Sequence, residues 1–256
     1  MEFEPYLQMA GHTLLFCFWS SLWPRQFVKE RLEPLVGFRT YRLFYVIGTV
    51  FLFGNTLLYL FQHSGQSAQL WNFTAIPGYR YILNTIGTIG IFFFFGTFSL
   101  GLSFWGLKDP PTEGGLQTGG YYKITRHPLY WSVFCLLLGH TLRLGSALAV
   151  LWFVLLETYN VFGVVVFENP GLRRQYGEEW VAFKNRVSTI PFLSLLRGDV
   201  KFEPGEFPTR RFVGAGVFAA IVIFFLHDVL IWLCYYLPPL GTVTEKVISE
   251  YQRIFG

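Results

Sequence analysis

Residues 120–144 read Gly-Tyr-Tyr-Lys-Ile-Thr-Arg-His-Pro-Leu-Tyr-Trp-Ser-Val-Phe-Cys-Leu-Leu-Leu-Gly-His-Thr-Leu-Arg-Leu. A polar loop ends at Arg126-His127-Pro128, and an apolar run follows that contains one more histidine, His140. Proline suits the first turn of a helix, because its missing N–H would have no partner there in any case. The stretch therefore predicts a helix that starts near Pro128 and joins a charged loop to an apolar interior.

Apolar blocks recur through the 256-residue chain, which is 52% hydrophobic and only 14% charged. A soluble domain carries about a quarter charged residues, and a helix needs ~20 apolar residues to cross a bilayer. Six blocks approach that length: 6–23, 41–61, 82–105, 129–144, 147–167 and 212–236. We predict an all-α integral membrane protein, a bundle of about six transmembrane helices forming one domain over 1–256. Six buried helices of a soluble protein are the alternative.

The basic residues indicate how this bundle is oriented. Sixteen of the twenty Lys and Arg residues fall in three alternate loops, 24–42, 106–128 and 168–211. Basic loops stay on the cytoplasmic side of membrane proteins. We therefore expect these loops, which also carry the motifs, to be cytoplasmic or stromal, and both termini to lie on the opposite side. The net charge of +4 arises in these loops, so no nucleic-acid partner is expected.

The longest polar segment contains a helix of a different kind. Asn169-Pro170-Gly171 predicts a break in the fifth helix, because proline cannot continue a helix without disturbing it. Apolar residues at three- and four-residue steps then predict a short amphipathic helix over 172–187. Such a helix would lie on the membrane surface or pack one side against the protein, and the sequence leaves both open.

Two histidines in different apolar blocks are candidates for metal ligands. Gly11-His12-Thr13-Leu14 is echoed by Gly139-His140-Thr141-Leu142. The two helices run in opposite directions, so His12 and His140 should lie at a similar depth in the bilayer. Histidines there ligate metal, haem iron included, or hydrogen-bond a neighbouring helix. We expect these two to be the metal-binding residues.

Ionisable groups in two further blocks are candidates for catalysis. Glu157 lies in the fifth block, and His227-Asp228 lies in the sixth. Such groups face the bundle interior and find partners there. Glu157 and His227 are therefore a candidate pair, which would act as a substrate-site acid or base or as a structural clamp between helices.

Arg126 and His127 precede the N-terminus of the helix predicted from Pro128. The positive end of a helix dipole binds carboxylates and phosphates, so these two residues are candidates for ligand binding. Simple anchoring of the helix at the membrane surface is the alternative.

A series of short motifs runs in order through residues 19–203. They are Gly37–Arg42, His63, Gln69–Trp71, Ile124–Pro128, His140–Leu142 with Gly145, Phe162-Gly163, Tyr176–Glu178, Arg186 with Ser188–Phe192, and Gly198-Asp199. In this order they resemble the NnrU-like family, which includes the 15-cis-ζ-carotene isomerases. The resemblance implies a multi-pass membrane protein whose additional C-terminal helix, 212–236, follows this core.

For the isomerases, the same resemblance implies haem b and cis-to-trans conversion of a carotenoid double bond. One haem-ligand histidine of that group matches His140, and the other matches Trp19 in this chain. His12 lies seven residues before Trp19, two turns along nearly the same helix face. His12 is therefore the candidate to take the place of the missing ligand, at a different depth along the helix.

The same core resembles, more distantly, the isoprenylcysteine and phospholipid methyltransferases. The matching residues are Gly120, Tyr122, Arg126, His127, Pro128, Tyr130, Glu168, Pro170, Leu172, Tyr176 and Gly177. In that family these regions form a cytoplasmic pocket for S-adenosylmethionine. The resemblance implies that Arg126, His127, Tyr130 and Glu168 bind the cofactor.

Three functions follow from these observations. The first is a haem-dependent isomerase acting on a lipophilic polyene that it takes from the lipid bilayer. The second is an S-adenosylmethionine-dependent membrane methyltransferase, and the third is a non-catalytic membrane subunit with the same fold. The sequence does not predict the oligomeric state.

Overall fold

The computed structural model describes residues 3–73, 76–98 and 115–201, with a few single residues between 214 and 229. Within these ranges the regular structure is helical, without named strands. Five long helices correspond to the first five apolar blocks: α1 (Glu4–Leu22), α3 (Phe38–His63), α4 (Tyr79–Phe98), α6 (Pro128–Leu144) and α7 (Ala147–Phe162). The block at 212–236 lies largely outside the described residues.

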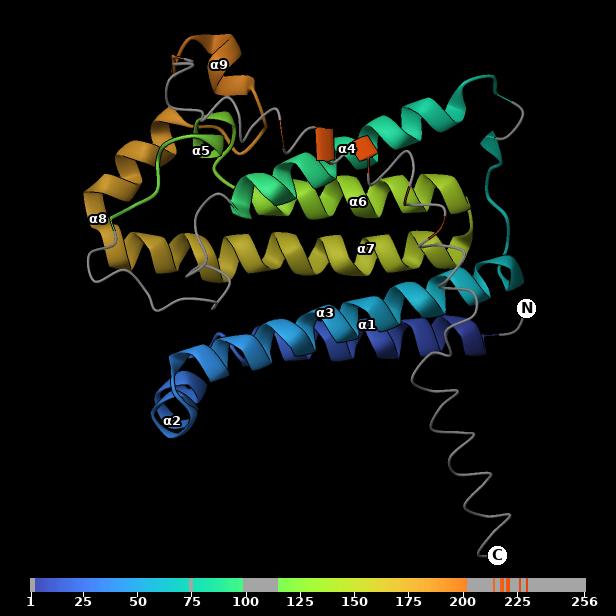
Figure 1. The fold of residues 1–256 in the computed structure, drawn as a ribbon, viewed down its shortest axis with the longest axis horizontal. Helices are drawn as coiled ribbons and strands as arrows, with labels where there is room; N and C mark the ends of the chain where they lie inside the picture. Colours follow the sequence, from blue (N-terminus) through green and yellow to red (C-terminus); the bar gives the residue numbers. More distant parts are fainter. Residues whose placement is uncertain are drawn as a thin grey trace, which may run out of the picture.

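The long helices pack along their lengths. α1 packs on α3 and α7, α6 packs on α7, and α4 packs on α6 (Figure 1). Buried side chains from α1, α3, α6 and α7 meet in the main core: Met9, Tyr59, Leu60, Leu137, Leu148, Ala149, Trp152 and Leu156. In this core the indole N–H of Trp152 donates a hydrogen bond to Thr56 Oγ1 at 3.1 Å, which joins α7 to α3.

The turn between α6 and α7 shows why these two helices end and begin where they do. Pro128 occupies the first turn of α6, as predicted. Gly145 ends α6 in the left-handed conformation, with φ of 60°. Ser146 then caps α7, because its side chain accepts a hydrogen bond from the backbone N–H of Ala149. Serine at this position satisfies a backbone donor that the helix itself leaves unpaired.

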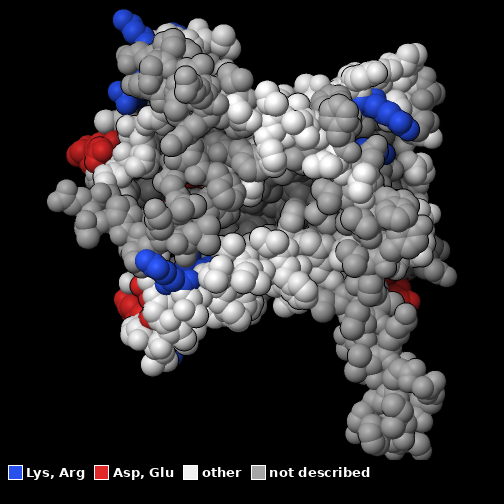
Figure 2. Space-filling model, viewed as in Figure 1, with Lys and Arg blue, Asp and Glu red and all other residues white. Residues whose placement is uncertain are grey.

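The four other described α-helices gather at one end of the bundle. They are α2 (Gln26–Val36), α5 (Tyr121–Ile124), α8 (Asn169–Arg186) and α9 (Leu193–Arg197), and the N-terminus lies at the other end (Figure 1). A single turn, η1 (Ser64–Gln66), follows α3. These four helices belong to the segments in which the sequence concentrates basic residues, so those segments share one end of the molecule. The described charged side chains visible in Figure 2 lie toward its two ends.

The predicted break at Asn169-Pro170-Gly171 is wrong. Helical structure continues from α7 through a π-helical segment, η3 (Gly163–Glu168), into α8. The backbone N–H of Asn169 bonds the carbonyl of Val164, five residues back, and this wider turn brings Pro170 in at the start of α8. The interruption lies instead at Gly177, whose φ of 52° and ψ of −125° are not helical.

The amphipathic side of α8 packs against the protein. Trp180, Phe183 and Val187 are buried, and Leu172 and Tyr176 pack against them. Of the two arrangements that the sequence left open, the packed helix is confirmed, and the apolar stripe of α8 is not available to a membrane surface.

A bundle of six spanning helices is not confirmed. Among the described residues, two continuous helical segments are long and apolar enough to cross a membrane: Phe38–Gln66 and Ala147–Arg186. Judged by length and composition alone, two such segments indicate membrane association only weakly.

Candidate functional site

The loop before α6 is bound to the segment after α8. Thr125 Oγ1 donates to the carbonyl of Thr189 at 2.6 Å, and the indole N–H of Trp131 donates to the same carbonyl at 2.7 Å. The backbone N–H of Arg126 donates to the carbonyl of Ser188 at 3.1 Å. Two motifs that are about sixty residues apart in the sequence thus form one hydrogen-bonded unit, which we call the loop clamp (residues 124–131 and 184–192).

Arg126 takes part in the loop clamp with its side chain as well. The guanidinium donates to the carbonyl of Lys184 at 3.3 Å and to Thr189 Oγ1. Burial lowers the pKa of Arg126, although a guanidinium remains charged in proteins. No ion pair to Arg126 is found among the described residues. Its observed contacts hold the loop and do not by themselves form an anion site.

His127 and Glu168 form a pair beside the loop clamp. His127 is only 3% exposed, and its Nδ1–H donates to Glu168 Oε1 at 3.1 Å. Glu168 is the last residue of η3, so the π turn sets the direction of its carboxylate. His127 Nε2 is buried and has no hydrogen-bond partner in the described part of the chain. A carboxylate that orients a histidine leaves the second ring nitrogen to act on a ligand.

Aromatic residues surround this pair. The Tyr130 ring stands edge-on to the His127 ring at 5.7 Å, and its hydroxyl is close to Glu168. Burial, together with the Glu168 carboxylate, raises the pKa of Tyr122 to about 12. The structure therefore brings together His127, Tyr130 and Glu168, three of the four residues predicted to bind S-adenosylmethionine.

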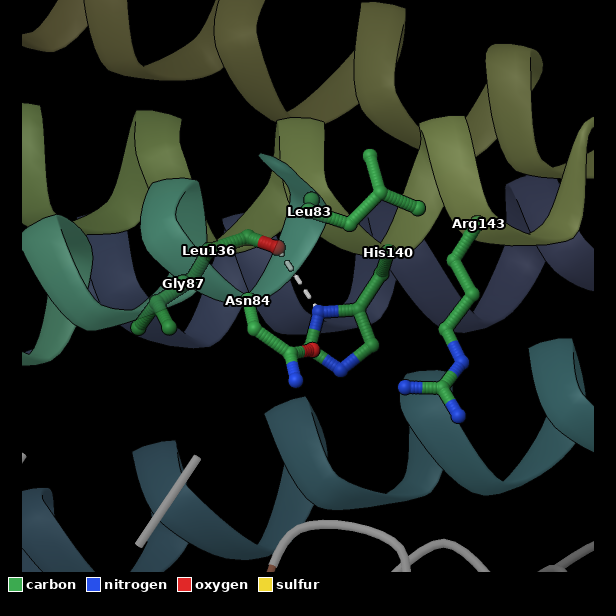
Figure 3. Close-up of a pocket in the computed structure, with 7 residues that line it drawn as sticks. Leu83, Asn84, Gly87, Leu136, His140 and Arg143 are labelled. Carbon is green, nitrogen blue, oxygen red and sulfur yellow. Dashed lines mark hydrogen bonds between the residues drawn. The ribbon is translucent and has the colours of Figure 1, made fainter. Parts of the chain in front are cut away.

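His140 lies on α6, at the other end of this helix. Its Nδ1–H donates to the carbonyl of Leu136 at 2.7 Å, and its ring centroid lies 5.5 Å from that of Phe61. When Nδ1 carries the proton, Nε2 carries the lone pair, and this is the arrangement typical of metal-binding histidines. Asn84 of α4 and Arg143 of α6 line the same cavity as His140 (Figure 3).

His12 approaches α3 from the side of α1. The Asn55 amide hydrogen-bonds His12 Nδ1 at 2.9 Å, and the His12 ring lies 5.1 Å from Tyr59, which stacks on His63 at 4.1 Å. Tyr59 of α3 contacts His12, and Phe61 of α3 contacts His140. Tyr59 and Phe61 are two positions apart, so their side chains leave the helix axis about 200° from each other. His12 and His140 therefore lie on opposite sides of α3.

The donor chemistry of His140 would suit a ligand of haem iron. The adjoining cavity of about 20 Å³ accommodates about one water molecule, so a porphyrin would require α4 and α6 to separate. His12 does not face this cavity, and the described residues contain no cluster of three or more metal-ligating side chains. Among the described residues, the chemistry of His140 thus suits a haem ligand, whereas the cavity beside it is too small for a porphyrin.

Trp19 is the residue that the sequence resemblance aligned with a haem-ligand histidine. Its ring packs on Trp23 and Phe44, and its indole N–H donates to the carbonyl of Tyr45 at 3.4 Å. A Cβ at Gly48 would lie 2.3 Å from the Trp19 ring. Glycine at 48 therefore makes room for the indole, and Trp19 joins α1 to α3.

The candidate catalytic residues are only partly described. Glu157 Oε1 accepts a hydrogen bond from the Asn160 amide at 3.2 Å, within α7. His227 and Asp228 lie outside the described residues, so the pairing of Glu157 with His227 stays a prediction.

A second clamp, which the sequence did not predict, closes the opposite end of α6. The backbone N–H of Leu70 donates to the carbonyl of Gly145 at 2.7 Å. Gln69 Nε2 donates to the carbonyl of Leu144 at 3.1 Å, and the indole N–H of Trp71 donates to that of Leu142 at 3.0 Å. We call residues 68–71 and 142–147 the turn clamp. The hydrogen bonds of the two clamps give a structural role to several of the motifs that follow one another along the chain.

Comparison with known proteins agrees with these motifs. The sequence model of the family described as NnrU protein matches residues 8–234. The 15-cis-zeta-carotene isomerase, chloroplastic, of Arabidopsis thaliana is 29% identical over 167 residues, which are 65% of this chain and 44% of the relative. The protein of the same description from Zea mays is 31% identical over 175 residues, 68% of this chain and 47% of the relative.

The chain spans about half the length of these curated relatives. No solved structure matches it. The family match, in contrast, covers nearly the whole chain and contains both clamps, the His127–Glu168 pair and His140. The chain therefore belongs to the NnrU family.

Proposed function

We propose that this protein is a membrane-embedded isomerase that converts a cis double bond of a carotenoid-like polyene to trans. The observation that carries the proposal is the similarity, over about two thirds of the chain, to two proteins described as 15-cis-zeta-carotene isomerases. A long polyene is lipophilic, so the substrate would enter from the bilayer.

The exposed surface of the helices supports placement in a membrane. Only 22% of the most apolar window of Phe38–Gln66 and 11% of that of Ala147–Arg186 are buried. A core helix of a soluble protein would be mostly buried, and soluble proteins rarely expose continuous apolar surface of this kind. We place the end with α2, α5, α8 and α9 on the cytoplasmic or stromal side, because basic segments remain there.

Haem b is the proposed cofactor, with His140 as its ligand through Nε2. Bound haem would supply an iron centre able to weaken the π bond of the cis double bond, so that rotation about this bond becomes possible. The Leu136 carbonyl fixes the orientation of the imidazole. Arg143 adds a positive charge beside the same cavity, which suits an acidic group on a bound cofactor.

Absorption spectra and product analysis of the purified protein test this proposal separately. His140→Ala should abolish a haem Soret band and the isomerisation of cis-ζ-carotene, measured by chromatography, whereas His12→Ala should keep both. Isomerase activity in a colourless protein would overturn the haem assignment alone. A well-folded, haem-loaded protein without activity on any cis-carotene would overturn the proposed reaction.

One observation favours the second candidate function, S-adenosylmethionine-dependent methyl transfer. His127, Tyr130 and Glu168 meet at one place, and His127 Nε2 is buried without a partner in the described part. Binding of S-adenosylmethionine, measured by calorimetry and lost in Glu168→Gln, would support this function. Absence of binding in the wild-type protein would reject it.

A further inference from the structure

Helix α2 has two distinct faces. At about 100° per residue, its apolar and polar residues separate around the helix axis. The apolar face carries Phe27, Val28, Leu32, Leu35 and Val36, and the polar face carries Gln26, Lys29, Glu30 and Glu33. Arg31 is the one charged residue that falls within the apolar face.

Much of the apolar face of α2 is uncovered. Leu35 is 78% exposed, Phe27 is 55% exposed and Val36 is 48% exposed, whereas Val28 and Leu32 are partly covered. No residue of α2 is buried. The polar face instead lines a groove together with Phe38 at the start of α3. A surface helix of a soluble protein has the opposite orientation, with its apolar stripe on the core.

Helix α8 provides a contrast. Both helices carry several charged residues and lie at the same end of the bundle (Figure 1). The apolar stripe of α8 is covered by its own protein through Trp180 and Phe183. An uncovered apolar face is therefore not a property of every helix at this end.

The neighbours of α2 indicate what covers this face. The rings of Trp23 and Tyr41 lie 5.4 Å apart where α1 ends and α3 begins, and the Tyr41 hydroxyl donates to the carbonyl of Trp23. Tryptophan and tyrosine concentrate at the membrane–water boundary. The long side chain of Arg31 can reach phosphate groups from an apolar surface. These are features of a helix lying in a lipid headgroup layer.

The direction of α2 agrees with that position. Figure 1 draws α2 nearly end-on, whereas α1 and α3 run across the view. If α3 crosses the bilayer, α2 lies parallel to the bilayer surface. We propose that α2 is an in-plane membrane helix whose apolar face, centred on Leu35, enters the boundary between headgroups and acyl chains.

This position has a consequence for the candidate site. The Arg25 guanidinium, just before α2, lies 3.7 Å from the centre of the Phe167 ring in η3. Phe167 directly precedes Glu168, which pairs with His127. This contact joins the segment before α2 to the segment that carries Glu168, so an in-plane α2 would place the His127–Glu168 pair near the level of the headgroups. The inference rests on the proposed membrane placement and is independent of the proposed reaction.

Depth-dependent fluorescence quenching tests this inference. An environment-sensitive fluorophore is attached to Leu35→Cys, Lys29→Cys or Val50→Cys, each in a chain whose Cys17, Cys135 and Cys234 are alanine. The proteins are reconstituted in vesicles of phosphatidylcholine and phosphatidylglycerol. Quenching is measured with lipids brominated near the headgroup, with lipids brominated deep in the acyl chain, and with aqueous iodide.

We expect the label at Leu35 to be quenched several-fold more by shallow bromolipid than the label at Lys29, on the opposite face. The label at Val50, in the middle of α3 and 65% exposed, should respond to deep bromolipid. If iodide quenches the label at Leu35 while bromolipid quenches the label at Val50, the inference about α2 is overturned. The proposed membrane placement of the protein would still be supported. Protection of Leu35 from all quenchers would mean that a protein surface covers it, which also overturns the inference.

Loss of lipid quenching at both Leu35 and Val50 would instead overturn the membrane placement itself. If removal of the native cysteines prevents folding, the chain with its own cysteines carries photoreactive benzoylphenylalanine at Leu35 or at Lys29. Lipid adducts detected by mass spectrometry at Leu35, and not at Lys29, support the inference. Equal adduct yields at both positions contradict it.

Discussion

Replacing Gly145 by alanine should strongly destabilise the protein. Gly145 has φ of 60°, and a left-handed conformation costs a residue with a Cβ roughly 1–2 kcal/mol. The new Cβ would also lie 2.1 Å from the carbonyl oxygen of Trp71 and 2.7 Å from Gln69 Nε2. The chain at 69–71 must therefore move away from the turn.

That movement breaks the turn clamp. The Gly145 carbonyl accepts hydrogen bonds from the backbone N–H groups of Leu70 at 2.7 Å and Trp71 at 3.2 Å, and each contributes about 1 kcal/mol net. The conformational and hydrogen-bond costs together reach about 3–4 kcal/mol. We expect the midpoint of thermal unfolding in detergent to fall by roughly 10 °C.

Gly54→Ala is the matched control. Gly54 lies within α3, and a Cβ there would meet no atom within 4 Å. Alanine is better than glycine inside a helix by about 1 kcal/mol, so this variant should unfold at the wild-type temperature or slightly above it. If Gly145→Ala unfolds no earlier than Gly54→Ala, the turn clamp does not stabilise the protein and the reasoning is refuted.

Three further predictions concern the rest of the fold. Gly48→Ala should destabilise by about 1–3 kcal/mol, because its Cβ would overlap the Trp19 ring; an unchanged unfolding temperature would contradict the packing described. Thr189→Val should cost about 1.5–3 kcal/mol by removing the side-chain acceptor of the partly buried Arg126 guanidinium, measured by thermal unfolding against an exposed Thr→Val variant. Burial raises the pKa of Tyr122 from 10.0 to about 12, so the unfolded chain ionises this phenol first and stability falls across that pH range. Tyr122→Phe should flatten this alkaline fall in chemical denaturation.

The positions of the long helices were predictable because they depend on local sequence. An apolar run of helical length satisfies its backbone hydrogen bonds within itself, so the blocks at 6–23 and 147–167 indicate helices without knowledge of their neighbours. The predicted break at Pro170 was wrong because the local sequence does not show how the surrounding structure accommodates a proline. Proline removes one donor, and a π turn accommodates that loss when the surrounding structure supports it.

The sequence predicted which residues belong to the candidate site, but it did not predict which of them contact one another. The sequence suggested His127 and Glu168 as ligand-binding residues, and the structure adds that they contact each other at 3.1 Å. Thr189 was part of a recognised motif, yet its hydrogen bonds to Thr125 and Arg126 were not predicted. Contacts between residues about sixty positions apart depend on how helices pack, and hydrophobic periodicity does not record that.

The sequence by itself determined that the chain is helical, where most of its long helices lie, and that basic residues collect in alternate loops, because these depend on composition and on residues near one another. Only the tertiary structure decided which side of each helix faces which neighbour. His12 and His140 have similar predicted depths, but they lie on opposite sides of α3. The sequence predicted the amphipathic pattern of α8 but treated 24–42 as a loop, in which α2 lies. Helix α8 buries its apolar face, whereas α2 leaves Phe27, Leu35 and Val36 exposed. The depth of a residue in the bilayer follows from its position along a helix. The neighbour that its side chain faces depends on how the other helices pack, and the local sequence does not specify this.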